Sequence, residues 1–207
     1  MVRFLYSANR RMPMEGDTNF KNLKKSYSAG KELQSRTLGI IGFGRIGQEV
    51  AKRAIGLGMK VLAHDKFINE ANISLNFFNG DKKTFTIETI EIDELLKESD
   101  FVTLHVPKNG DEALITAEKI GLMKKGSGII NTSRGGLVDE TALMFALDKE
   151  KLAYAGLDVF DNEPTPSMHL LMHNAISMTP HIGAATNEAQ DRIGIELADQ
   201  IISYFKK

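Results

Sequence analysis

The chain has 207 residues, enough for one α/β domain with a sizeable core but too few for two domains of comparable size. Its 26 basic and 27 acidic residues nearly balance, so composition gives no electrostatic support for binding nucleic acid or an acidic membrane. The absence of cysteine excludes disulfides, thiolate catalysis and cysteine metal ligands. We therefore expect a small molecule as the partner.

The first part of the chain, residues 1–36, does not follow the pattern of the rest. Pro13, Gly16 and Gly30 interrupt its apolar positions, which predicts short helices outside the main sheet. The first twelve residues do not resemble a signal peptide, and no apolar run approaches the roughly 20 residues of a membrane span, so we expect the protein in the cytoplasm.

This lead-in arm carries more large apolar side chains than a solvated arm needs. A second copy of the chain could cover them, so we expect a homodimer that pairs through the arm. The side chains are Phe4, Leu5, Tyr6, Met12, Met14, Phe20, Leu23 and Tyr27.

The segment 37–186 alternates between strand and helix patterns. Ile46, Val50 and Ala54 recur every four residues, and Asp139 is a predicted N-cap of the next helical run. This alternation predicts an α/β fold with a doubly wound parallel sheet, of the Rossmann type. The runs rich in β-branched residues that predict its buried strands are 37–41, 60–63, 101–106, 128–132, 154–159 and 175–179.

Two segments stand apart from this alternation. Residues 67–91 carry a Gly-Asp turn between aromatic and Thr-rich stretches, which predicts an excursion or an irregular strand pair of no assigned function. Residues 187–207 form the predicted C-terminal helix, in which Ile193, Leu197 and Ile201 have helical spacing.

The motif GFGRIG at 42–47 follows a predicted strand and opens a predicted helix, the context of a dinucleotide-binding fingerprint. Gly42 permits the tight turn, Gly44 lets the backbone approach a pyrophosphate, and Gly47 lets the helix pack close to the strand. Arg45 and Ile46 offer amides at the positive end of the helix dipole. We expect the phosphates of NAD over 44–46.

Asp65 ends the second predicted strand. A carboxylate there would accept hydrogen bonds from the adenosine ribose and repel a 2′-phosphate. The sequence therefore favours NAD over NADP, although the adjacent Lys66 weakens this preference.

Three late segments, NTSRGG, LDVFDNEP and PHIGAAT, place Arg134, Glu163 and His181 in that order, each beside a Gly or Pro. Oxidation of a 2-hydroxy acid needs a base for the hydroxyl proton, a carboxylate to orient that base, and a cation for the substrate carboxylate. Each residue alone is compatible with an ordinary surface or packing role. Their order and spacing together favour a catalytic set.

These segments and the glycine motif resemble the D-isomer-specific 2-hydroxyacid dehydrogenases, most closely the D-3-phosphoglycerate dehydrogenases, from about Leu23 to the end. The resemblance implies hydride transfer between NAD and a 2-hydroxy or 2-keto acid, and a substrate domain that is largely missing from this chain. It also implies further cofactor contacts from Val106, Pro107, Thr132, Ser133, Asp158 and Gly183.

Several alternatives stay open. Enzymes for D-lactate, glyoxylate or hydroxypyruvate share the same residues, and a non-catalytic dinucleotide-sensing module shares the fold. His105 is interpreted as a packed or capping imidazole. His169 and His173 have the spacing of metal ligands on one helix face, but no third ligand is evident, so we expect no metal.

Overall fold

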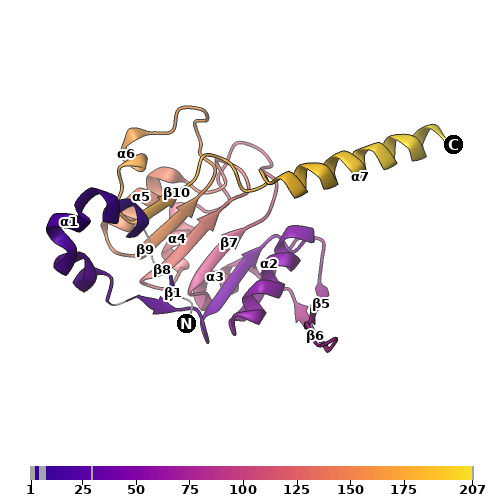
Figure 1. Cartoon of the computed structure of the whole chain (residues 1–207), viewed down its shortest axis with the longest axis horizontal. Coiled ribbons are helices and arrows are strands. Elements are labelled where there is room, and N and C mark those ends of the chain that lie inside the picture. Colours follow the sequence, from indigo (N-terminus) through magenta and orange to yellow (C-terminus); the bar gives the residue numbers. More distant parts are fainter. Residues whose placement is uncertain (1–2, 5–7, 29, 207) are drawn as a thin grey trace.

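The computed structural model describes residues 3–4, 8–28 and 30–206. Its centre is a fully parallel six-stranded sheet in the order β10-β9-β8-β7-β3-β4 (Figure 1). Each strand overlaps one of the six predicted runs, which confirms the predicted doubly wound sheet. The strands are β3 (Thr37–Ile41), β4 (Lys60–His64), β7 (Phe101–Leu104), β8 (Ser127–Asn131), β9 (Leu152–Leu157) and β10 (Ile176–Met178).

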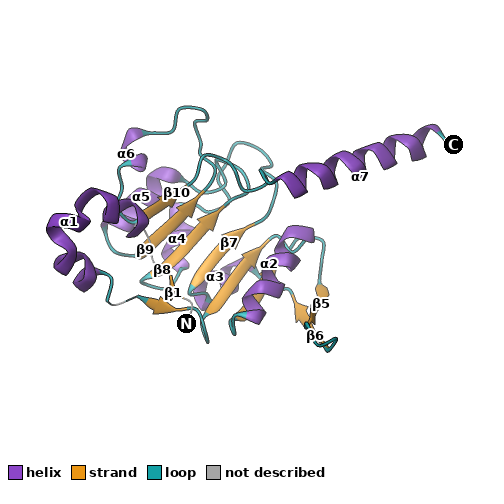
Figure 2. Ribbon diagram, in the orientation of Figure 1, coloured by secondary structure: helices purple, strands orange, loops and turns teal. Residues whose placement is uncertain are grey.

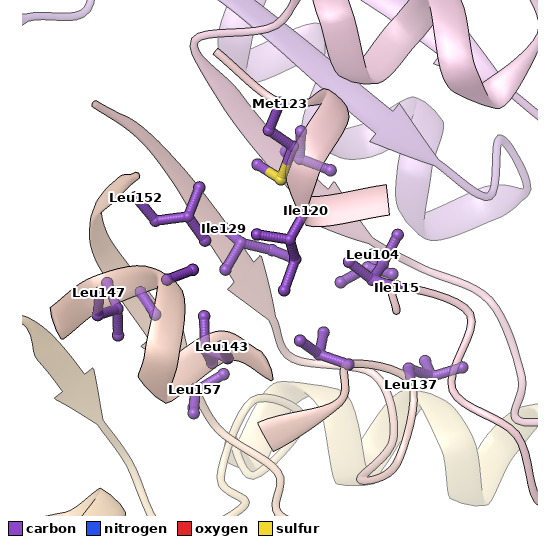
Figure 3. Close-up of a cluster of buried hydrophobic side chains, with 14 of the residues drawn as sticks. Leu104, Ile115, Ile120, Met123, Ile129, Leu137, Leu143, Leu147, Leu152 and Leu157 are labelled. Carbon is purple, nitrogen blue, oxygen red and sulfur yellow. The ribbon is translucent and has the colours of Figure 1, made fainter. Parts of the chain in front are cut away.

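Both faces of this sheet are covered (Figure 2). Successive side chains of a strand point to opposite faces, and accordingly Ile40 and its neighbour Ile41 are both buried but belong to separate core clusters. One cluster packs on α2 (Arg45–Gly56). The other, drawn in Figure 3, packs on the helices α3 (Ile92–Glu98), α4 (Ala117–Leu122), α5 (Glu140–Asp148) and α6 (Met168–Leu171).

The excursion at 67–91 is a regular antiparallel hairpin. Strand β5 (Glu70–Asn76) pairs with β6 (Lys82–Glu88) along its whole length with no register shift. The predicted turn carries Gly80 with φ +88°. Ile73 is fully buried in the α2 cluster, so one face of the hairpin completes the core on that side of the sheet.

The lead-in arm contains a helix, α1 (Ala8–Ser26), and an antiparallel pair of β1 (Arg3–Phe4) with β2 (Lys31–Glu32). The predicted short helices are present, because α1 is kinked at Asn19, with φ −127° and ψ 20°. The predicted positions of the break are wrong, because Pro13 and Gly16 both lie inside the helical part before Asn19. Side-chain contacts one helical turn apart link residues on this helix. The Arg11 guanidinium donates to Glu15 over 2.7 Å, and Glu15 also accepts from Asn19.

At the other end, α7 (Asn187–Phe205) begins at the residue predicted for the closing helix and ends at Phe205, before the predicted end. The Thr186 hydroxyl caps it by accepting from the Ala189 amide. None of its residues is buried, and Figure 1 shows it extending away from the sheet. In the part of the chain that the structure describes, no helix is long and apolar enough to cross a membrane.

Candidate active site

The fingerprint loop between β3 and α2 has a backbone that only glycine permits at two positions. Gly42 has φ +95°, and a Cβ placed on it would lie 2.4 Å from the carbonyl oxygen of His105. A Cβ on Gly47 would lie 2.1 Å from the carbonyl oxygen of Gly42, so this glycine lets α2 start close to β3. At Gly44, by contrast, a Cβ would meet nothing within 4 Å. That side of the loop is open.

Unpaired amides point out of the same loop. The first helical hydrogen bond of α2 runs from the Gln48 amide to the Gly44 carbonyl, and Gly44 offers no capping side chain. Among the residues that the structure describes, no acceptor partners the amides of Arg45, Ile46 and Gly47. Free donors at a helix N-terminus beside an open glycine fit the pyrophosphate of a dinucleotide.

Asp65 follows β4, and its carboxylate accepts hydrogen bonds from backbone amides of the protein itself, in addition to the ribose contact predicted for it. Its Oδ2 accepts from the Phe43 amide over 2.7 Å, and its Oδ1 accepts from the amides of Phe67 and Ile68. Partial burial acts to raise the pKa of Asp65, but the three amide donors outweigh it and lower the pKa. The carboxylate is therefore charged at neutral pH and anchors the loop.

The structure brings together Glu163 and His181, which are 18 residues apart in sequence. His181 follows β10, and its Nδ1 lies 2.8 Å from Oε2 of Glu163. Oε1 of Glu163 accepts from the Phe160 amide, so the carboxylate has a defined orientation. The hydrogen bond with His181, followed by that from Phe160, lowers the pKa of Glu163. With Nδ1 engaged, Nε2 is the ring atom left to face a substrate.

A buried carboxylate, Asp158 at the end of β9, shapes the segment that carries His181. It accepts hydrogen bonds from the Thr179 hydroxyl and from the amides of Ile182 and Gly183, on both sides of the histidine. Burial acts to raise the pKa of Asp158, and these donors lower it overall. Asp158 and Gly183 are therefore hydrogen-bonded to each other. The cofactor contacts predicted for them remain predictions.

Arg134 follows β8 at the same edge and is exposed, with Nη1 donating to the Ser133 carbonyl over 2.6 Å. Asn131, which sequence reasoning did not single out, shapes this turn. Its buried side chain accepts from the Ser133 amide and donates to the Arg134 carbonyl. An Asn bonded to the amide two residues on is an Asx turn, so an Asn ending a predicted strand was the available signal.

The remaining predicted residues lie at the same carboxyl edge of the sheet. Val106 and Pro107 follow β7, and Val106 borders Gly42. Thr132 is exposed beyond the end of β8. The His105 ring lies 3.1 Å from the Thr103 hydroxyl, and burial lowers its pKa, in keeping with a packed imidazole.

The two histidines with metal-ligand spacing have ordinary surroundings. His169 is exposed. His173 accepts from the Ala175 amide at Nδ1, and its Nε2 lies 3.4 Å from Asp148. Within residues 3–4, 8–28 and 30–206 no group of three or more His, Cys, Asp or Glu side chains could hold a metal.

The comparisons with known proteins agree with this geometry. Residues 1–183 match the family model described as D-isomer specific 2-hydroxyacid dehydrogenase, NAD binding domain. The chain belongs to this family and contains its NAD-binding domain.

Two curated relatives and one solved structure illustrate the match. A hydroxypyruvate reductase of Thermotoga maritima is 45% identical over 182 residues, covering 86% of this chain and 56% of the relative. A D-3-phosphoglycerate dehydrogenase of Synechocystis sp. is 41% identical over 173 residues, covering 83% of this chain and 30% of the relative. A glyoxylate reductase from Paecilomyes thermophila has a TM-score of 0.78 at 31% identity, covering 97% of this chain and 59% of that one. The chain thus spans about half or less of the length of these curated relatives.

Proposed function

We propose that this chain is the cofactor-binding and acid-base part of an enzyme that interconverts D-2-hydroxy acids and 2-keto acids. The observation that carries the proposal is the hydrogen bond between His181 and Glu163, at the sheet edge where the fingerprint loop opens. Ligands of open α/β sheets bind at this carboxyl edge. Bound NADH would supply the hydride that reduces the keto carbon.

The three proposed catalytic residues divide the remaining work. Arg134 grips the substrate carboxylate and the carbonyl oxygen with its guanidinium fork. His181, protonated and oriented by Glu163, donates a proton from Nε2 to that oxygen as the carbonyl is reduced. In the oxidative direction Nε2 accepts the hydroxyl proton. Beside the pair, a cavity of about 480 Å³ has mainly apolar walls that include Phe160, Leu171 and Met178.

For the cofactor we propose NAD rather than NADP. The 44–46 loop segment would hold the pyrophosphate, and Asp65 would face the adenosine ribose, where its charge repels a 2′-phosphate. Val106, Pro107, Thr132 and Ser133 are the proposed neighbours of the adenosine and nicotinamide ends.

For the substrate we propose 3-phosphoglycerate and its keto acid, which places the reaction in serine biosynthesis. Similarity to several D-3-phosphoglycerate dehydrogenases supports this choice. Hydroxypyruvate is the second candidate, because the Thermotoga maritima relative of that name is 45% identical. We further propose a homodimer, supported by Met12, Met14 and Phe20, which are all exposed on α1. We also propose a cytoplasmic location.

The test is NADH oxidation by the complete protein, including the residues that its relatives have beyond this chain. Phosphohydroxypyruvate, hydroxypyruvate, glyoxylate and pyruvate would be compared by kcat/KM, each with NADH and NADPH. We expect the phosphorylated acid with NADH to be the best pair. Cofactor binding without oxidation of NADH by any of these acids would instead support a dinucleotide-sensing module.

A further inference from the structure

Two of the three proposed catalytic residues, Arg134 and Glu163, lie on two segments that touch at two places. Residues 134–140 begin with Arg134 and run into α5, whereas residues 158–163 lead from β9 to Glu163. At the first contact Gly135 lies directly against the Phe160 carbonyl, where a Cβ would come within 1.8 Å of the oxygen. At the second contact Oε1 of Glu140 accepts a hydrogen bond from the Asp161 amide over 2.9 Å.

The Glu140 contact reaches Glu163 through a short stretch of backbone. The amide of Phe160 donates to Glu163, and the next amide, that of Asp161, donates to Glu140. The other oxygen of Glu163 holds His181. A shift of the backbone at 160–161 would therefore move the carboxylate that orients the imidazole. The Glu140 side chain holds this backbone to the Arg134 segment by its hydrogen bond to the Asp161 amide.

We propose that Glu140 is a positioning residue, which clamps the loop bearing Glu163 onto the segment bearing Arg134 and so aligns the guanidinium with the His181–Glu163 pair. This inference rests on the proposed function for its catalytic meaning, whereas the clamp itself concerns the folded chain alone.

An acid in the first turn of a helix also has an ordinary role, which is to complement the helix dipole. Glu140 differs from the matched residue Glu118, in the first turn of α4, because Glu118 is exposed. Glu140 is half-buried, and burial raises its pKa against the effect of the Asp161 amide. Its carboxylate accepts from the Asp161 amide, a contact with the neighbouring loop that a role toward the helix dipole does not require.

The structural test is a carbon-13 NMR titration of the Glu163 carboxyl in this chain, assigned with Glu163→Gln. Glu140→Ala removes the oxygen that accepts from the Asp161 amide. Glu140→Asp keeps an acid in the first turn of α5 on a side chain that is one carbon shorter. Glu140→Gln keeps an acceptor oxygen without charge. Loss of the clamp weakens the Phe160 and His181 hydrogen bonds. We expect the pKa of Glu163 to rise toward its ordinary value by about half a unit or more in the Ala and Asp variants.

The Gln variant and the control Glu118→Ala should not raise the pKa of Glu163. Loss of a nearby negative charge alone would lower that pKa, so the sign separates the clamp from a charge effect. No rise in the Asp variant, which is the least disruptive to α5, would overturn the proposal. An equal rise in the Gln variant would also overturn it.

The functional test uses the complete protein. We expect Glu140→Ala to lower kcat about five- to tenfold with little change in the KM for NADH, and Glu140→Gln to recover most of the loss. An unchanged kcat in the Ala variant would contradict the positioning role. If even the unmodified protein turned over no keto acid, the proposed function would fail, while the titration would still decide whether Glu140 holds Glu163.

Discussion

His181 has a left-handed backbone conformation, with φ 55°. The buried side chain of Asp158 holds the chain on both sides of it, through the Thr179 hydroxyl before it and the amides of Ile182 and Gly183 after it. Non-glycine residues adopt this conformation at a cost that the surroundings must offset. The two amides bonded to Asp158 supply such surroundings. The orientation of the imidazole thus depends on Asp158, although Asp158 bonds to the neighbours of His181 and not to its ring.

We predict that Asp158→Asn destabilises the chain by about 2–3 kcal/mol at pH 7. The side-chain NH2 of asparagine would face one of the groups that donate a hydrogen bond to Asp158, and that hydrogen bond would be lost. The folded carboxylate has a lowered pKa. Its contribution is therefore complete above the unfolded value of about 4 and is lost as pH falls through the folded value.

Urea unfolding between pH 3 and 8 measures this difference. The gap between the two proteins should be constant near neutral pH and shrink below about pH 4. Asp111→Asn, at an exposed position, is the control and should change little. A gap that stays constant to the lowest pH would contradict the assignment.

Sequence reasoning found residues by type and local motif, and it missed those whose role depends on tertiary contacts. Arg134, Glu163 and His181 each stand beside a turn signal. Glu140 has the sequence pattern of an ordinary first-turn acid, and its partner, the Asp161 amide, is 21 residues away. Asn131 carried a recognisable local signal in its Asx turn that was not used.

The positions of the helices and strands could be predicted best where an element buries a continuous apolar run. Strands such as β3 and β7, buried at every residue, match their predicted positions closely. The lead-in helix was harder, because Pro13 and Gly16 signal breaks, whereas the chain stays helical through both and kinks at Asn19. Local propensity alone is a weak guide to where a helix breaks.

Two glycines at opposite ends of α2 form a matched pair for substitution by alanine. Gly44 is the N-cap of the helix and Gly56 is its last residue. A Cβ meets nothing within 4 Å at either Gly44 or Gly56, and neither has a positive φ, so both accept alanine sterically. We predict that Gly44→Ala keeps the fold but weakens NADH binding at least tenfold, because the methyl group occupies the side open to the pyrophosphate.

Gly56→Ala should leave NADH binding unchanged and stabilise the chain by up to about 1 kcal/mol, since alanine favours helix. Calorimetric titration and thermal unfolding of both variants are the measurements. Equal NADH affinity in the two variants would mean that the dinucleotide does not lie over Gly44.

At the scale of the whole molecule, the chain leaves apolar surface at both ends. On α7 the side chains of Ile193, Leu197 and Ile201 are each at least half exposed, and on α1 those of Met12, Met14 and Phe20 are exposed. Leu23, also expected at the dimer contact, is instead buried within its own chain, and Leu5 and Tyr6 lie outside the described residues. The sequence could mark these surfaces but not what covers them.

We predict that the chain forms a homodimer through the arm, because a two-fold contact would cover the exposed face of α1. Light scattering should give the mass of a dimer at micromolar concentration. Deleting residues 1–30 should yield a monomer or an aggregate. A stable monomer with the arm intact would contradict the prediction.

The central claim is that His181 is the acid-base group of a keto acid reductase. The most direct measurement is kcat for the preferred keto acid and NADH, with the complete protein and its His181→Ala variant, alongside calorimetric NADH binding. We predict that kcat falls about 100-fold or more, because proton transfer to the carbonyl oxygen loses its donor, while NADH affinity is retained. Near-normal turnover by the variant would contradict the account.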